Sequence, residues 1–211
     1  MTFLAIVLGA GLIWVIFFSG LIIQKKQMQT PIGETPSPAP SQDSGVVKQD
    51  TVVFETNYGT FKVKLDLAAA PKTSANMQKL VSEKFYDGLT FHRVIDGFMI
   101  QGGDPKGDGT GGPNYTVPAE IGLPHKRGVI ATARTSDQFN PTRASSGSQF
   151  FITLTDASDE TLASLDAGGY TVFGQVVSGM DVVDKIGKVA TGDSDKPVKP
   201  VIINHAILIN E

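Results

Sequence analysis

The sequence predicts a mainly β domain, folded as a closed barrel with two α-helices and preceded by one transmembrane helix. Short apolar or alternating runs of strand length recur along the chain and are separated by glycine-rich loops. Two amphipathic stretches interrupt these runs, and a long uncharged apolar run stands at the N-terminus. Closing the strands into a barrel leaves no exposed sheet edge, and the two helices are expected to cover its ends.

The composition limits the number of domains and the available chemistry. At 211 residues the chain has room for one full-sized domain and an appendage. Its 18 basic and 21 acidic residues lack the basic excess of a nucleic-acid-binding surface, so we expect no nucleic-acid partner. The absence of cysteine excludes disulfides, thiolate nucleophiles and cysteine-bound zinc. His92, His125 and His205 are far apart and form no ligand motif, so we predict no metal site.

Residues 1–24 are predicted to form a membrane anchor. Every side chain from Phe3 to Ile23 is uncharged and most are large and apolar, a run long enough to cross a hydrocarbon layer of about 30 Å as a helix. A buried core helix of this length would rarely lack a charged edge. A cleaved signal peptide is the closer alternative, but it normally has a basic start, a shorter apolar stretch and a small-x-small cleavage site. None of these is clear here, which favours an uncleaved single-pass anchor.

Residues 25–49 are predicted to be a flexible linker, because their Pro/Ser/Gln-rich composition cannot bury enough apolar surface to fold. Lys25 and Lys26 follow the apolar run, and the positive-inside rule applied to these two residues alone would place the domain in the cytoplasm. A spacer that holds a domain clear of the bilayer is common outside the cytoplasm. We therefore expect a membrane-anchored protein with an extracytoplasmic domain.

The folded domain is expected to span residues 50–211. It opens with two alternating runs around Asn57-Tyr58-Gly59, the pattern of a β-hairpin. One helix is expected to begin with Pro71 and end at Asp87-Gly88, and a second, short helix to span Met180 to Ile186. The remaining strands are expected at the runs FHRV, GFMIQ, GVIATA, SQFFITL, TVFGQVV and KPVIINHAILI.

Two familiar enzyme motifs fit this sequence poorly. Residues 107–112 satisfy GxGxxG, but a dinucleotide site needs a helix directly after that loop, and Pro113 and Asn114 follow instead. These glycines are better explained by a tight surface loop beside a cleft. A serine hydrolase using His92 would need a GxSxG elbow, which is absent.

Two segments carry the functional information: FHRVIDGFMIQGGDP at residues 91–105 and SGSQFFITL at residues 146–154. Both are rich in apolar residues that a pure core role would explain. Arg93 fits that role least well, because an unpaired buried guanidinium is costly, although a salt bridge would also account for it.

These motifs, together with LDAGGYTVFGQV at residues 165–176, closely resemble the cyclophilin family, and the resemblance extends from about Thr51 to the C-terminus. It implies a closed eight-stranded antiparallel β-barrel capped by two α-helices, with a hydrophobic groove that accepts proline-containing polypeptides. The implied activity is peptidyl-prolyl cis/trans isomerisation, which assists protein folding. By this resemblance the catalytic residues are Arg93, Gln101 and Phe98, and the substrate-binding residues are His92, Met99, Ala133, Arg134, Gln149, Phe151, Leu165 and Tyr170.

The proposed residues suit this reaction. Rotation about an X-Pro bond faces a barrier of about 18–20 kcal/mol, and the prolyl nitrogen regains its lone pair only in the twisted transition state. Arg93 is always protonated and is therefore a suitable donor to that nitrogen. The reaction needs no nucleophile, metal or cofactor, and we expect none. The alternative is a proline-peptide-binding chaperone or scaffold with little catalysis, for which a transition-state donor is unnecessary.

The sequence departs from the family in two places. Ser164 stands where many members have a tryptophan just before the leucine of the LDG segment, so we expect weak cyclosporin binding. The loop at residues 134–147 is longer than the usual connection and borders the groove, which affects the assignment of Ala133 and Arg134 most directly.

Overall fold

The computed structural model of this chain describes residues 50–155 and 160–210. The predicted anchor at 1–24 and linker at 25–49 lie outside these residues. None of the helices in the described ranges has the length and apolar character needed to cross a membrane.

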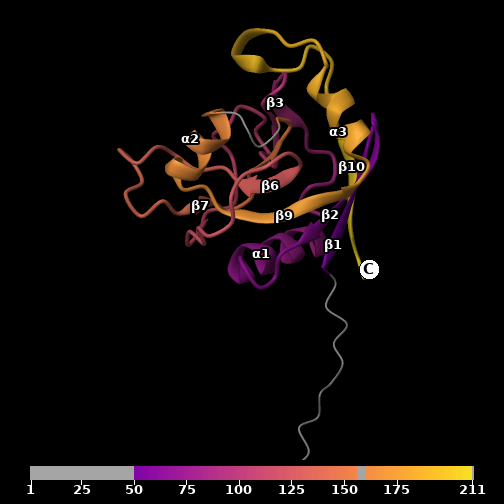
Figure 1. Cartoon of the computed structure of the whole chain (residues 1–211). Helices are drawn as coiled ribbons and strands as arrows, with labels where there is room; N and C mark the ends of the chain where they lie inside the picture. Colours follow the sequence, from indigo (N-terminus) through magenta and orange to yellow (C-terminus); the bar gives the residue numbers. More distant parts are fainter. Residues whose placement is uncertain (1–49, 156–159, 211) are drawn as a thin grey trace, which may run out of the picture. The chain divides into compact units, whose positions relative to one another are not determined.

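Eight strands form one curled antiparallel sheet, in the order β10-β1-β2-β9-β6-β8-β4-β3 (Figure 1). A separate ribbon pairs two short strands, β5 and β7. The strands are β1 (Thr51–Thr56), β2 (Gly59–Leu65), β3 (Phe91–Ile95), β4 (Met99–Gly102), β5 (Thr116–Val117), β6 (Val129–Thr132), β7 (Ser145–Ser146), β8 (Phe150–Thr153), β9 (Val172–Ser178) and β10 (Ile203–Ile209).

The prediction of a closed barrel is wrong, because the sheet ends at β10 on one side and β3 on the other. Only an isolated bridge between Thr90 and Ile202 and a few neighbouring backbone hydrogen bonds link the two ends in the described chain. On its other side Ile202 bonds to the β1–β2 turn: its N–H donates to Asn57 Oδ1 at 2.9 Å, and its carbonyl accepts the Asn57 N–H at 3.2 Å. With its two end strands joined only by this short bridge, the sheet is a half-barrel.

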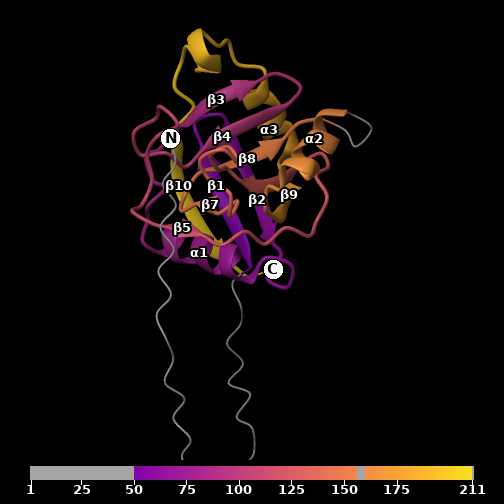
Figure 2. The ribbon, with the colours of Figure 1, turned by 90° about the vertical axis from the view of Figure 1, so that its left-hand side faces the viewer.

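Three α-helices accompany the sheet in the described ranges, where two were predicted (Figure 2). α1 (Pro71–Ser82) begins with the expected proline but ends five residues before Asp87, since turns follow Ser82. α3 (Met180–Gly187) matches the second predicted helix. α2 (Glu160–Gly168) was missed, because it is short and buries only Leu162 and Leu165.

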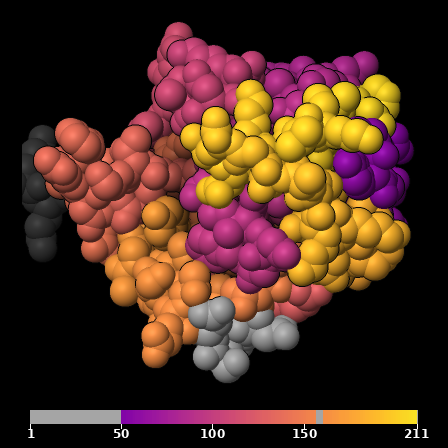
Figure 3. Space-filling view, turned by 90° about the horizontal axis from the view of Figure 1, so that it is seen from above, coloured from indigo at the N-terminus to yellow at the C-terminus, as the bar shows by residue number. Residues whose placement is uncertain are grey.

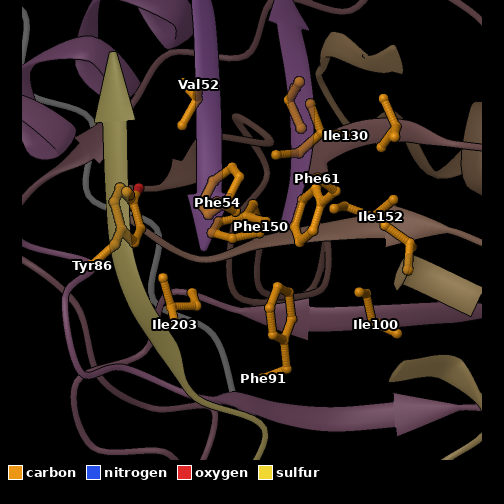
Figure 4. Packing of buried hydrophobic residues seen from close by; sticks show 14 of the residues in the cluster. Val52, Phe54, Phe61, Tyr86, Phe91, Ile100, Ile130, Phe150, Ile152 and Ile203 are labelled. Atoms are coloured by element: carbon orange, nitrogen blue, oxygen red, sulfur yellow. The ribbon is translucent and has the colours of Figure 1, made fainter. Parts of the chain in front are cut away.

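The main core lies inside the curl of the sheet and is rich in aromatic rings (Figure 4). Phe54 stacks on Phe61 with ring centroids 5.1 Å apart, and Phe150 packs against Phe54 and Phe91 at 5.5 and 6.0 Å. Burying one such side chain contributes roughly 1.5–3 kcal/mol. Because strand residues alternate between faces, this core also fixes which neighbouring residues must point outward.

Candidate active site

A row of side chains crosses four neighbouring strands on the outer face of the sheet. Arg93 on β3 lies opposite Gln101 on β4, Gln101 lies opposite Phe151 on β8, and Phe151 lies opposite Ala131 on β6. Their sequence neighbours Val94, Ile100, Phe150 and Ile152 belong to the main core on the other face. The period of two along each strand therefore brings a cation, an amide and an aromatic ring into one line.

This row borders a groove of about 250 Å³, whose lining residues come from β3, β4, β8, α2 and the segments beside β6 and β9. An apolar cluster that includes Met99, Phe151 and Leu165 forms its floor, with Phe98 and Tyr170 packed against it. Nine of the eleven predicted site residues line the groove together: Arg93, Phe98, Met99, Gln101, Ala133, Arg134, Phe151, Leu165 and Tyr170. Their individual roles stay predictions.

Gln149 lies beside the groove and not in it, lining a neighbouring cavity of about 790 Å³. Gln101 Nε2 donates to Gln149 Oε1 at 3.1 Å, and Gln149 Nε2 donates to the carbonyls of Gly109 and Gly111 at 3.0 and 2.7 Å. Gln149 is buried. Its position makes it a link between the groove residue Gln101 and the glycine-rich loop.

Asp104 organises that glycine-rich loop. Its buried carboxylate accepts backbone N–H groups of Lys106 at 2.7 Å, Asp108 at 3.1 Å and Gly109 at 2.6 Å. Burial acts to raise the pKa of Asp104, but the backbone N–H donors outweigh it and hold the pKa below its usual range. A Cβ at Gly111 would collide with the Asp104 carboxylate, so this position requires glycine. The GxGxxG match is thus a loop whose N–H groups bind the chain's own carboxylate.

His92 is buried beside the groove. In the part of the chain that the structure describes, neither ring nitrogen has a hydrogen-bond partner. Burial lowers the pKa of His92, against an opposing effect of the Asp104 carboxylate, so the ring stays neutral at pH 7. His92 lines the cavity formed with residues 193–196 and does not line the groove. The pairing of β3 with β4 shifts register between Phe91 and Arg93, as a bulge does, and His92 is the residue of β3 that has no partner on β4.

The 134–147 loop is fastened to the rim of the groove by Arg134. The Arg134 guanidinium lies over the Tyr170 ring at 4.9 Å, donates to the Gly168 carbonyl and pairs with Asp137 at 2.6 Å. Asp137 also pairs with Arg143 at 3.0 Å, and the hydrogen bond from Arg134 is the largest cause of its lowered pKa. Arg134 therefore shapes the groove wall through Tyr170 while holding the loop.

His125 was considered only as a metal ligand, yet the structure places it behind the groove floor. Its ring stacks on Phe151, with centroids 5.9 Å apart and an interplanar angle of 5°. Asp166 fixes the ring, since its Oδ1 lies 2.6 Å from His125 Nδ1 and accepts the His125 backbone N–H at 2.8 Å. These contacts span 41 residues, so no local sequence signal predicts them.

The groove and the half-barrel define a class: a mainly β protein with an apolar surface groove bordered by an arginine side chain. A protein-family model described as "Cyclophilin type peptidyl-prolyl cis-trans isomerase/CLD" matches residues 51–208. Peptidyl-prolyl cis-trans isomerase A of Dickeya dadantii is 40% identical over 172 residues, covering 76% of this chain and 85% of that protein. Peptidyl-prolyl cis-trans isomerase-like 1 of Aspergillus fumigatus is 39% identical over 166 residues, covering 76% and 96%.

A solved structure of the same family is also similar to this chain. The cyclophilin type peptidyl-prolyl cis-trans isomerase of Cryptosporidium parvum, crystallised in the presence of the dipeptide Ala-Pro, aligns with a TM-score of 0.67 at 30% sequence identity, covering 76% of this chain and 99% of that one. This chain belongs to the cyclophilin-type peptidyl-prolyl cis-trans isomerase family. The predictions of the family and of peptidyl-prolyl isomerase activity are confirmed.

Proposed function

We propose that this isomerase catalyses cis/trans rotation about X-Pro bonds. Arg93 is the hydrogen-bond donor to the transition state, and the apolar groove binds the proline ring. The observation that carries the proposal is the convergence of nine predicted residues on one groove. Phe98, Met99, Phe151 and Leu165 supply the apolar surface that holds the proline ring. The guanidinium of Arg93 lies at the same groove and supplies N–H donors there.

The apolar groove and Arg93 have different roles in the proposed reaction: the groove binds the proline ring, and Arg93 stabilises the transition state. Apolar burial binds the ground state and the transition state alike, which sets affinity. A hydrogen bond to the prolyl nitrogen forms only when rotation has restored its lone pair, which lowers the barrier. Gln101, opposite Arg93 on β4, is placed to hold the peptide backbone beside the donor. The clients are proline-containing polypeptides, and the proposed cellular role is assistance to protein folding.

The test is cis/trans exchange of an X-Pro peptide, followed by NMR line shapes or exchange spectroscopy with the full chain in mild detergent. We expect catalysed exchange, together with chemical-shift changes of the peptide on binding. Peptide binding without any acceleration would support the proline-peptide-binding chaperone or scaffold instead. Absence of both binding and acceleration by the folded protein would rule out both roles.

We further propose that residues 1–24 anchor the protein in a membrane and that residues 25–49 hold the domain outside the cytoplasm. The uncharged run from Phe3 to Ile23 and the Pro/Ser-rich stretch that follows support this. We expect the protein to stay in the membrane pellet after alkaline carbonate extraction and to be digested by protease in spheroplasts. Release into the supernatant would overturn the anchor, and digestion only after lysis would overturn the topology.

Ser164 leads to a prediction about inhibition. It lies on the exposed side of α2, next to the groove residue Leu165, and its hydroxyl donates to the Thr161 carbonyl at 2.6 Å. A serine there offers far less apolar surface than tryptophan, so we expect cyclosporin to inhibit only weakly. Ser164→Trp should tighten inhibition by about tenfold or more, in line with burying an aromatic side chain. Titration of the exchange assay with cyclosporin measures both, and nanomolar inhibition of the unmodified protein would contradict the expectation.

A further inference from the structure

A loop near the C-terminus reaches over to the catalytic arginine. Residues 190–198 form a small hairpin, in which Val198 N–H donates to the Ala190 carbonyl at 2.9 Å and Gly192 N–H donates to the Lys196 carbonyl at 2.8 Å. Its tip is the short 3₁₀ turn η1 (Asp193–Asp195). The loop is the yellow segment beside β3 at the top of Figures 1 and 2, and in Figure 3 its surface adjoins the magenta surface, the colour of β3 and β4.

At this tip a carboxylate meets the guanidinium. Arg93 Nε donates to Asp195 Oδ2 at 3.2 Å, and the two side chains are each a little under half exposed, at 43% and 44%. The contact uses the one guanidinium N–H that lies closest to the side-chain stem. Within residues 50–155 and 160–210, no hydrogen bond occupies either terminal nitrogen, so both can meet a substrate in the groove. The bond therefore restricts how the guanidinium turns without occupying its outer edge.

Two residues at the tip of this loop have left-handed backbone conformations. Ser194 and Asp195 both have positive φ, at 58° and 59°. Residues with a Cβ seldom adopt this left-handed conformation, and two in succession are rarer still. The hairpin hydrogen bonds on both sides hold the strained tip in place. In this conformation the Asp195 carboxylate lies beside Arg93 on β3.

We propose that Asp195 is a positioning residue for catalysis: it orients Arg93 so that its terminal N–H groups face the prolyl nitrogen in the transition state. This inference rests on the proposed role of Arg93. An isolated exposed ion pair contributes little to stability, because water and salt screen it. Its effect on rate can be larger, because a donor held in the productive orientation needs no reorganisation when the bond twists.

The test compares Asp195→Ala, Asp195→Asn and Asp193→Ala in the full chain by NMR exchange of an X-Pro peptide. Asp195→Ala should lower kcat by about tenfold and leave KM within about twofold, because Asp195 orients the donor and does not bind the peptide. Asp195→Asn keeps an acceptor oxygen and should recover much of the loss. Asp193→Ala removes the same charge from the same turn without touching Arg93, and should behave like the unmodified protein.

A double-mutant cycle separates positioning from a general structural effect. In an Arg93→Ala background, Asp195→Ala should cause no further loss, because the residue it orients is absent. The ¹⁵N-resolved Arg93 Nε–H signal should shift and exchange faster in Asp195→Ala, with the unfolding midpoint nearly unchanged. Full activity of Asp195→Ala, equal losses for Asp193→Ala, or an additive loss in the double variant would each overturn the inference. Inactivity of the unmodified protein would instead overturn the proposed function.

Discussion

Arg93→Ala should lower kcat/KM for X-Pro exchange by about 10²- to 10³-fold, the cost of removing one donor that is aimed at developing charge in a transition state. The loss should fall mainly on kcat, because the apolar floor of Phe98, Phe151 and Leu165 still binds the proline ring. The kcat/KM of Arg93→Lys should lie between those of the unmodified protein and Arg93→Ala. An ammonium keeps the charge but has neither the planar guanidinium nor the Nε contact to Asp195. Peptide titration in the exchange assay gives both constants.

Arg143→Ala is a matched control for this experiment. Arg143 also carries an ion pair, to Asp137 at 3.0 Å, but it does not line the groove. Its removal should leave kcat/KM within about twofold of the value for the unmodified protein, because an exposed surface ion pair contributes little to stability. A similar loss in both variants, or full activity of a folded Arg93→Ala protein, would show that Arg93 is not the donor.

Asp104→Ala should destabilise the domain by about 3 kcal/mol, because the buried carboxylate bonds the backbone N–H groups of Lys106, Asp108 and Gly109. The variant should also lose activity, since the loop that Asp104 holds carries the carbonyls bound by Gln149, the partner of Gln101. Urea unfolding at pH 7 measures the first effect and peptide exchange measures the second. An unchanged urea midpoint would show that the loop is held by other contacts.

The same carboxylate makes stability depend on pH in one direction. The pKa of Asp104 is lower in the folded protein than the value of about 3.9 usual in an unfolded chain. Its contribution is therefore complete above that value and is lost as the pH falls through the lower, folded pKa. Urea midpoints measured between about pH 5 and pH 2 should fall less steeply for Asp104→Asn than for the unmodified protein. Asp108→Asn, at an exposed neighbour whose pKa is also lowered by the Thr110 hydroxyl, tests whether the effect is specific to the buried carboxylate.

The groove residues were predicted by family resemblance, and strand alternation explains why those on the strands share one face. Phe150 and Phe151 are adjacent in sequence, yet one enters the core and the other forms the groove floor, as a period of two requires. His92 and Gln149 were assigned to the peptide site by family resemblance and lie beside it. His92 is the extra residue of a register shift between Phe91 and Arg93, and such a bulge has no sequence signal of its own.

The remaining differences arise from contacts between distant residues. Asp195 meets Arg93 across 102 positions of sequence, and His125 meets Asp166 across 41. Asn57 in the β1–β2 turn bonds both backbone groups of Ile202, a residue 145 positions away. Propensity and periodicity describe residues that are close in sequence. The residues in each of these pairs are far apart in sequence, so neither signal could predict the contacts.

The pairing of β1 with β10 joins the beginning of the domain to its end and has a consequence for biosynthesis. While a ribosome is still translating, β1 has β2 on one side and an empty edge on the other until residues 203–209 emerge. The groove also needs segments from Arg93 to Tyr170, so a nascent chain that has not reached Tyr170 has no complete groove of its own. Until that point, isomerisation at prolines such as Pro105 and Pro118 can only be spontaneous or depend on a finished copy of the enzyme.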